Sequence, residues 1–161
     1  MSQYVRIVSA LSRIAGWFAI GLMIAAALVV TEMVVIRYAL RASTVWQTEF
    51  VTFALVAATF LGSPYVLLEK GHVAVDVLPL AAGPRGRAIM AVIAGLIGIS
   101  FCALLAWSAS HYFMEAWSNG WRTETVWALP LWIPILPMPL GVGLLVLQYV
   151  AEIWQSVRGN A

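Results

Sequence analysis

The amino-acid sequence predicts an all-α membrane protein with four transmembrane helices and a short interfacial helix between the second and the third. Composition is the first reason, because 63% of the 161 residues are hydrophobic and only 10% are charged, whereas soluble domains carry about 25% charged residues. The second reason is that four long stretches contain almost no charge, and each is near the ~20 residues that cross the hydrocarbon core. The third is the tryptophans near the ends of these stretches, since indole rings favour the headgroup level of a bilayer.

The first predicted span covers residues 14–36, between Arg13 and Arg37, and its one charged residue is Glu32. Its apolar run exceeds the ~7–15 residues of a signal-peptide core, so we expect it to remain in the protein as a helix. Glu32 precedes Arg37 by five positions, which corresponds to about 7 Å of helix rise. We therefore expect Glu32 to be a boundary carboxylate near the membrane surface, with a proton or ion relay as the alternative.

The second predicted span covers residues 46–68 and has a recognisable start. Thr44 is followed three positions later by Gln47, the spacing of a capping box in which both side chains bond to backbone N–H groups of the first turn. Trp46 falls at the predicted membrane surface. Glu49 falls in the early turns, where a negative charge suits the positive end of the helix dipole.

A short interfacial helix is predicted over residues 72–84, after the second span. Alternating valines here could also indicate a strand, but an isolated strand beside a bilayer would leave its backbone groups unpaired. Asp76 is placed to be the N-cap of this helix, and Pro84 lies where it would end. We also expect His72 and Asp76 to hold the preceding turn through hydrogen bonds to the local backbone.

The third and fourth predicted spans cover residues 88–112 and 128–153. Small residues scattered along the third span favour close approach of a neighbouring helix, although their spacing is not a strict GxxxG. The fourth span starts with four prolines, namely Pro130, Pro134, Pro137 and Pro139. These cannot all lie within a regular helix, so an irregular or kinked start is predicted there.

The distribution of Lys and Arg predicts that both termini are cytoplasmic. Four spans put the termini on one side, which then holds six basic residues, whereas the other side holds three. The larger group is Arg6, Arg13, Lys70, Arg85, Arg87 and Arg158, and the smaller group is Arg37, Arg41 and Arg122.

The sequence offers no constellation for catalysis, a cofactor or a metal. Cys102 is alone and cannot form a disulfide within the chain, so it is interpreted as a small buried hydrophobe. His72 and His111 fall toward opposite ends of the spans, which argues against a bis-histidyl haem. Glu69, His72 and Asp76 do not have the spacing of a metal site. Basic residues are scattered, which argues against nucleic-acid binding.

Two adjoining stretches resemble one transporter family. "WQTEFVTFALVAATFLG" at 46–62 and "GSPYVLLEKGHVAVDVLPL" at 62–80 are similar to the small permease subunit of tripartite ATP-independent periplasmic (TRAP) transporters, the DctQ type. The residues that match the family pattern are Trp46, Glu49, Gly62, Glu69, Gly71, His72 and Asp76. The resemblance extends along the chain in length, in the four spans and in the proline-bearing last helix.

The resemblance implies a role in ion-coupled uptake of organic anions such as carboxylates across a bacterial inner membrane. A subunit of this type joins a larger multi-span permease subunit, which carries the substrate and sodium sites. A periplasmic substrate-binding protein delivers the substrate. The small subunit enlarges the static scaffold and would itself hold no cofactor.

Three arginines on the side away from the termini are candidates for a dock for the binding protein. Arg37, Arg41 and Arg122, together with Trp117 and Trp121, are of the residue types that anchor interfaces. The alternative is that they anchor the helices at the membrane surface.

Two other functions compete with the scaffold. An autonomous four-helix proton-coupled carrier would need a carboxylate deep in its first helix, whereas Glu32 lies near the end of its span. A membrane enzyme or haem subunit would need a set of reactive or ligating residues, and the sequence offers none.

Overall fold

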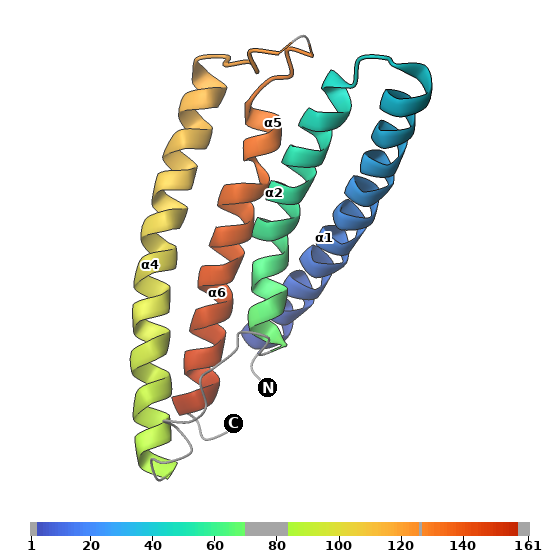
Figure 1. The fold of residues 1–161 in the computed structure, drawn as a ribbon. Coiled ribbons are helices and arrows are strands. Elements are labelled where there is room, and N and C mark those ends of the chain that lie inside the picture. Colours follow the sequence, from blue (N-terminus) through green and yellow to red (C-terminus); the bar gives the residue numbers. More distant parts are fainter. Residues whose placement is uncertain (1–2, 70–83, 126, 158–161) are drawn as a thin grey trace.

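The computed structural model describes residues 3–69, 84–125 and 127–157 (Figure 1). These residues contain helices and no strand, and the only strand-like pairing among them is an isolated bridge between Arg122 and Pro130. Four helical spans are long and apolar enough to cross a membrane: Gln3–Leu40, Val45–Leu68, Ile93–Ser118 and Trp132–Trp154. The predicted fold class, an all-α membrane protein with four spans, is confirmed.

The first helix, α1 (Gln3–Val35), begins well before the predicted span and passes into a π-helical turn, η1 (Ile36–Leu40). Its early part is helical because Val5, Val8 and Ser12 are buried against the rest of the protein at helical spacing. Arg41 ends the turn in the left-handed region, with φ 50° and ψ 31°.

The second helix, α2 (Val45–Leu68), begins directly after Thr44 as predicted, but the predicted capping box is wrong. The Thr44 side chain makes no capping hydrogen bond. Thr44 is instead buried, and its carbonyl accepts a hydrogen bond of 3.1 Å from the Thr48 hydroxyl. Gln47 is also buried, and its Oε1 has no hydrogen-bond partner in the described ranges. The side chains of Thr44 and Gln47 therefore pack against the rest of the protein instead of capping the helix.

The predicted interfacial segment, 72–84, lies outside the described residues except for Pro84, which is the first residue of α4 (Pro84–Ser118). Three buried side chains on α4 recur at intervals of seven: Cys102, Ala109 and Ala116. This spacing produces one narrow contact seam along the helix.

The predicted irregular start of the fourth span is confirmed. A short helix, α5 (Trp132–Ile135), is separated by Leu136 from α6 (Pro137–Val157). Proline lacks a backbone N–H and its ring clashes with the preceding turn, which explains why the helix divides here.

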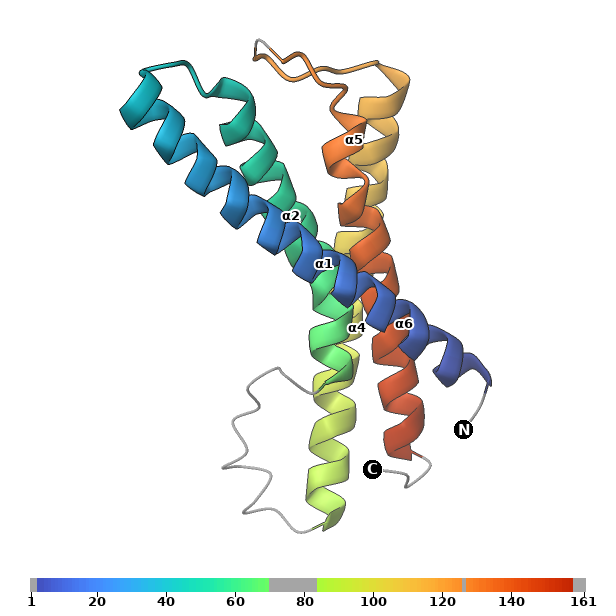
Figure 2. The ribbon, with the colours of Figure 1, turned by 90° about the vertical axis from the view of Figure 1, so that its right-hand side faces the viewer.

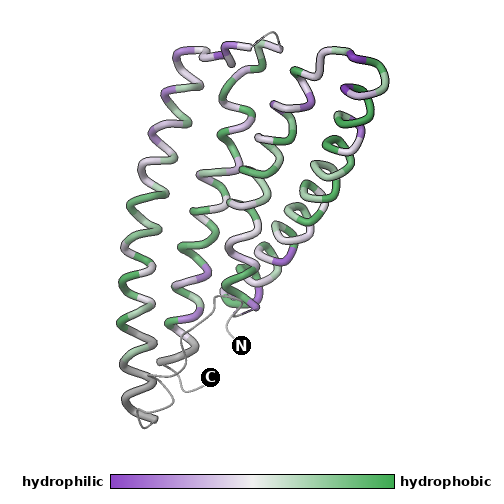
Figure 3. Tube along the Cα trace, in the orientation of Figure 1, coloured by the Kyte–Doolittle hydropathy of each residue, from purple (hydrophilic) through white to green (hydrophobic). Residues whose placement is uncertain are grey.

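Helix α6 is the centre of the bundle, since it packs against α1, α2 and α4. Within the described residues, α4 packs against α5 and α6 but not against α1 or α2. Figure 2 shows that α1 runs obliquely across the other helices, and that the α1–α2 hairpin leans away from α4 and α5 at one end. The middles of the long helices are mostly apolar, and polar residues gather toward their ends (Figure 3).

The contact between α2 and α6 depends on a proline and a glycine. Pro64 lies inside α2 and has no N–H to offer to the carbonyl of Phe60, four residues earlier. Gly141 on α6 lies against that same carbonyl, so closely that an added Cβ would overlap it. The freed carbonyl is therefore covered by protein, as backbone at membrane depth must be.

Candidate interaction surfaces

The three candidate arginines lie at the end of the molecule opposite Gln3, the first residue of α1, and Val157, the last residue of α6. Arg37 lies on η1, Arg41 follows it, and Arg122 lies on the connection between α4 and α5. All three side chains are exposed. Figure 1 shows both segments at the same end of the bundle, and Figure 2 shows that they lean apart. The structure therefore brings the arginines to one end but on two separate segments.

The α4–α5 connection is ordered by hydrogen bonds between its own backbone groups. The Leu131 amide donates to the Trp121 carbonyl at 2.8 Å, and the Thr123 amide donates to the Leu129 carbonyl at 2.9 Å. The Thr123 hydroxyl accepts a further hydrogen bond of 3.0 Å from the Leu129 amide. This network folds the connection back on itself and holds Arg122, between Trp121 and Thr123, at a fixed place.

Two edge-to-face pairs of aromatic rings pack at this connection. Trp117 on α4 meets Trp132 on α5 edge-on, with ring centroids 4.8 Å apart, and Tyr112 meets Trp121 at 6.2 Å. Edge-to-face pairs of this kind stabilise beyond their buried area. Trp117 and Trp121 remain partly exposed beside Arg122, so the connection presents a rigid surface with aromatic and cationic groups.

The residues that match the family pattern do not come together in one site. Trp46 and Glu49 lie near the start of α2, Gly62 lies in its second half against the Cβ of Ala19, and Glu69 caps the other end. The 24 residues of α2 rise about 36 Å, so Trp46 and Glu69 lie near opposite surfaces of a membrane. Gly71, His72 and Asp76 lie outside the described residues.

Glu49 is half-buried, and both of its carboxylate oxygens are buried without a hydrogen-bond partner among the described residues. It lies 11 positions, or three helical turns, before Phe60, and therefore on the same face of α2. That is the face on which Gly141 of α6 packs. Glu32, by contrast, is exposed on α1.

His111, expected to have no haem partner in this chain, packs beside Trp107 with ring centroids 5.2 Å apart. Within the described ranges, no group of three or more His, Cys, Asp or Glu residues could hold a metal ion.

A buried polar pair joins α1 to α6, and the sequence reasoning missed it. The Ser12 hydroxyl donates to Oε1 of Gln148 at 3.1 Å, and both residues are fully buried. Nε2 of Gln148 has no hydrogen-bond partner within the part of the chain that the structure describes. Close by, the Tyr4 hydroxyl donates to the carbonyl of Leu147 at 2.9 Å. The available signal was the single amide side chain in this span, because such residues usually face another helix.

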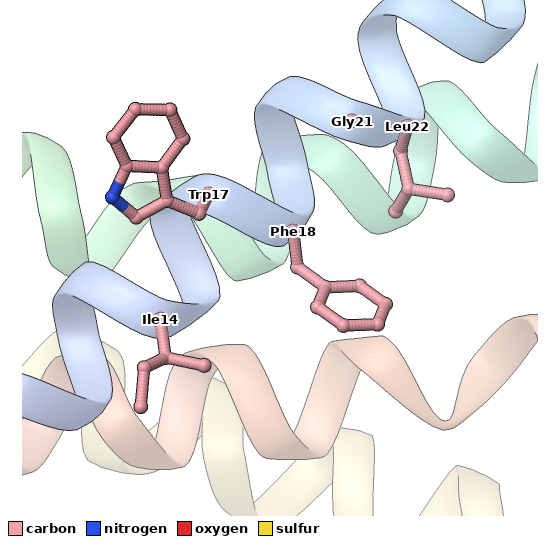
Figure 4. Close-up of a pocket in the computed structure, with 5 residues that line it drawn as sticks. All are labelled: Ile14, Trp17, Phe18, Gly21 and Leu22. Atoms are coloured by element: carbon pink, nitrogen blue, oxygen red, sulfur yellow. The ribbon is translucent and has the colours of Figure 1, made fainter.

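An open apolar hollow of about 430 Å³ lies on the outside of α1. It is lined by Ile14, Trp17, Phe18, Gly21 and Leu22, as Figure 4 shows. Ile14 and Phe18 project to one side of the helix and Trp17 to the other. A Cβ added to Gly21 would meet nothing within 4 Å. Periodicity alone did not reveal this hollow, since every face of α1 is apolar.

Comparison with known proteins matches this chain to one transporter family. The model of the family described as tripartite ATP-independent periplasmic transporters, DctQ component, matches residues 26–159. The C4-dicarboxylate TRAP transporter small permease protein DctQ of Vibrio cholerae serotype O1 (strain ATCC 39315 / El Tor Inaba N16961) is 26% identical to the chain over 151 residues. The match covers 79% of this chain and 64% of the relative, so it spans less than two thirds of that protein's length.

Proposed function

This chain belongs to the DctQ component family of the tripartite ATP-independent periplasmic transporters, and we propose that it acts as the small membrane subunit of such a transporter. In this role it is a scaffold for a larger multi-span permease subunit during ion-coupled uptake. The substrate would be an organic anion of the carboxylate class, because the relative from Vibrio cholerae is named for C4-dicarboxylates. The substrate would be delivered by a periplasmic binding protein.

The observation that carries the proposal is how little of each apolar span is covered by the chain itself. Only 11% of the most apolar window of the first span and 17% of that of the third are buried inside the protein. Large apolar side chains such as Phe18, Phe101 and Trp107 project outward along these spans. Helices with open apolar flanks can face lipid and a partner protein at once, which is what a membrane scaffold requires.

A role as an autonomous carrier is not supported by the placement of the acidic residues. A proton-coupled carrier needs its carboxylate inside the bundle or facing a water-filled cavity. Glu32 is exposed on the outer side of α1 and lies near the end of its span. The family is a transporter component rather than an enzyme class, and we propose that the chain catalyses no reaction.

We place the protein in the bacterial inner membrane with both termini in the cytoplasm. The excess of Lys and Arg on the side of the termini supports this orientation. Gln3 and Val157, the described residues nearest the termini, belong to helix ends that lie together (Figure 1). The opposite end, with Arg37, Arg41 and Arg122, would then face the periplasm.

We further propose that these three arginines form part of the dock for the binding protein. Their support is exposure, shared position at one end, and the rigid aromatic surface beside Arg122. The paired replacement Arg41→Glu and Arg122→Glu should raise the concentration of binding protein needed for half-maximal uptake. Arg13→Glu, at the other end of the molecule, is the matched control. Equal uptake by both variants at limiting binding protein would exclude docking at these residues.

The scaffold role is tested by purification and reconstitution. The tagged chain, expressed from its native operon and extracted in mild detergent, should retain a larger multi-span membrane protein identified by mass spectrometry. Liposomes that contain this chain alone should move no dicarboxylate, whereas liposomes that contain the complex should do so when binding protein and an ion gradient are present. Transport by the chain alone would overturn the proposal.

A further inference from the structure

The outer face of α1 carries a second stripe of residues, which are exposed in the described part of the chain except for the half-buried Ala25. Its residues alternate at steps of four and three along the helix: Ile14, Phe18, Gly21, Ala25, Leu28 and Glu32. Residues at this spacing share one face of a helix. The stripe lies on a different side of α1 from the seam of Ser12, Ala19 and Ala26, whose side chains are buried.

The shape of this stripe is suited to contact with another transmembrane helix rather than with lipid acyl chains. Gly21 and Ala25 are four residues apart in its middle, and large exposed side chains, Phe18 and Leu28, stand on either side. The hollow of about 430 Å³ occupies one end of the stripe, where Gly21 lines it together with Ile14, Trp17, Phe18 and Leu22 (Figure 4). Small residues four positions apart allow the backbones of two membrane helices to approach closely.

Glu32 adds charge complementarity at one end of the stripe. It is exposed, and it lies 11 positions beyond Gly21, which puts the two on the same face about 16 Å apart along the helix. A carboxylate on the outer side of a membrane span is costly unless a cation or hydrogen-bond donor meets it. A helix of a partner protein can carry Lys or Arg at the level of Glu32, near the end of the span.

We propose that this face of α1 binds a transmembrane helix of the larger permease subunit, which places small side chains against Gly21 and Ala25 and a Lys or Arg beside Glu32. The identity of the partner rests on the proposed function, but the location of the interface is carried by the stripe, the hollow and the exposed carboxylate. The first span, which carries the stripe, is also the least covered by its own chain.

Two substitutions test the hollow. Gly21→Phe fills it without a clash inside this chain, because a Cβ at Gly21 meets nothing within 4 Å. We expect the amount of co-purified large subunit to fall about tenfold or more, since an overfilled contact costs at least that factor in binding. Ala103→Phe is the control, because Ala103 is an exposed position on the outside of α4. It should leave the yield of the complex unchanged.

The carboxylate is tested separately and in the assembled complex. Glu32→Lys should reduce co-purification, and Glu32→Gln should reduce it less because an amide keeps a hydrogen bond. A photo-crosslinking residue at Leu28 should join this chain to the larger subunit, whereas one at Trp107 on α4 should not. A crosslink from Leu28 only to lipid, or to a second copy of this chain, would overturn the inference.

The results separate this inference from the proposed function. If the wild-type chain retains no larger membrane protein, the scaffold role itself fails. If the wild-type chain retains it and Gly21→Phe does so equally well, only the placement of the interface on α1 is wrong.

Discussion

Replacement of Gly141 by alanine is expected to force α2 and α6 apart. A Cβ at this position would come within 2.5 Å of the carbonyl carbon of Phe60 and 3.0 Å of the amide nitrogen of Leu61. Comfortable carbon contacts need about 3.5–4.0 Å. The obstacle is backbone, so no change of rotamer can relieve it, and the two helices must separate locally by about 1 Å.

Such overpacking typically costs about 1–3 kcal/mol, which is a factor of about 5 to 150 in the folding equilibrium. The free energy of unfolding can be measured by titrating the purified protein in mixed micelles with SDS and following tryptophan fluorescence. Gly141→Ala should unfold at a clearly lower fraction of SDS than the wild-type protein.

Gly143→Ala is the matched control on the same helix. A Cβ at Gly143 meets nothing within 4 Å, so the substitution should be neutral or should stabilise α6 by about 0.5–1 kcal/mol, the usual advantage of alanine over glycine in a helix. Equal stability of Gly141→Ala and Gly143→Ala would refute the close approach of α6 to the carbonyl of Phe60.

Three further predictions concern the polar pair and the α4–α5 connection. Ser12→Ala leaves the buried Gln148 amide without its partner and should lower the free energy of unfolding by about 1–3 kcal/mol in the SDS titration; addition of Gln148→Leu should recover part of this loss, and no recovery would contradict the pairing. Thr123→Val, but not Thr123→Ser, should increase amide hydrogen exchange in the connection, because valine cannot accept the backbone hydrogen bond. Trp132→Leu removes the edge-on contact with Trp117 and should cost about 0.5–1.5 kcal/mol beyond the lost area; unchanged stability and near-ultraviolet circular dichroism would argue against that contact.

Much of the fold follows from where charge and proline interrupt the apolar runs. The four spans were predictable because a charged side chain cannot easily be placed at the centre of a bilayer. The break between α5 and α6 was predictable because proline cannot continue a regular helix. Both are local rules that act within a few residues.

The start of α1 and of α2 depended on packing and was less predictable. Arg13 suggested a boundary, yet Val5 and Val8 continue the buried seam and extend the helix to Gln3. At the start of α2, the short-range capping pattern was overridden by burial.

The residues of the candidate surfaces were predictable from the sequence, but their arrangement in space was not. The sequence indicated that three arginines share one end of the molecule, because each lies in a connection on the same side. Their separation on two diverging segments depends on the tilt of α1 and α2 relative to α6 (Figure 2). That tilt is set by contacts between distant residues, such as Ser12 with Gln148 and Phe60 with Gly141. No short-range sequence pattern predicts such contacts between distant residues.

The central position of α6 has a consequence for biogenesis. Chains are synthesised and inserted from the N-terminus, so α1, α2 and α4 enter the membrane before α6, the last of the described helices. Among these, α4 has no long helix to pack against until α6 arrives. A ribosome stalled before Pro137 would therefore leave a hairpin and a solitary helix in the bilayer, a form that insertion chaperones and membrane proteases could distinguish from the finished subunit.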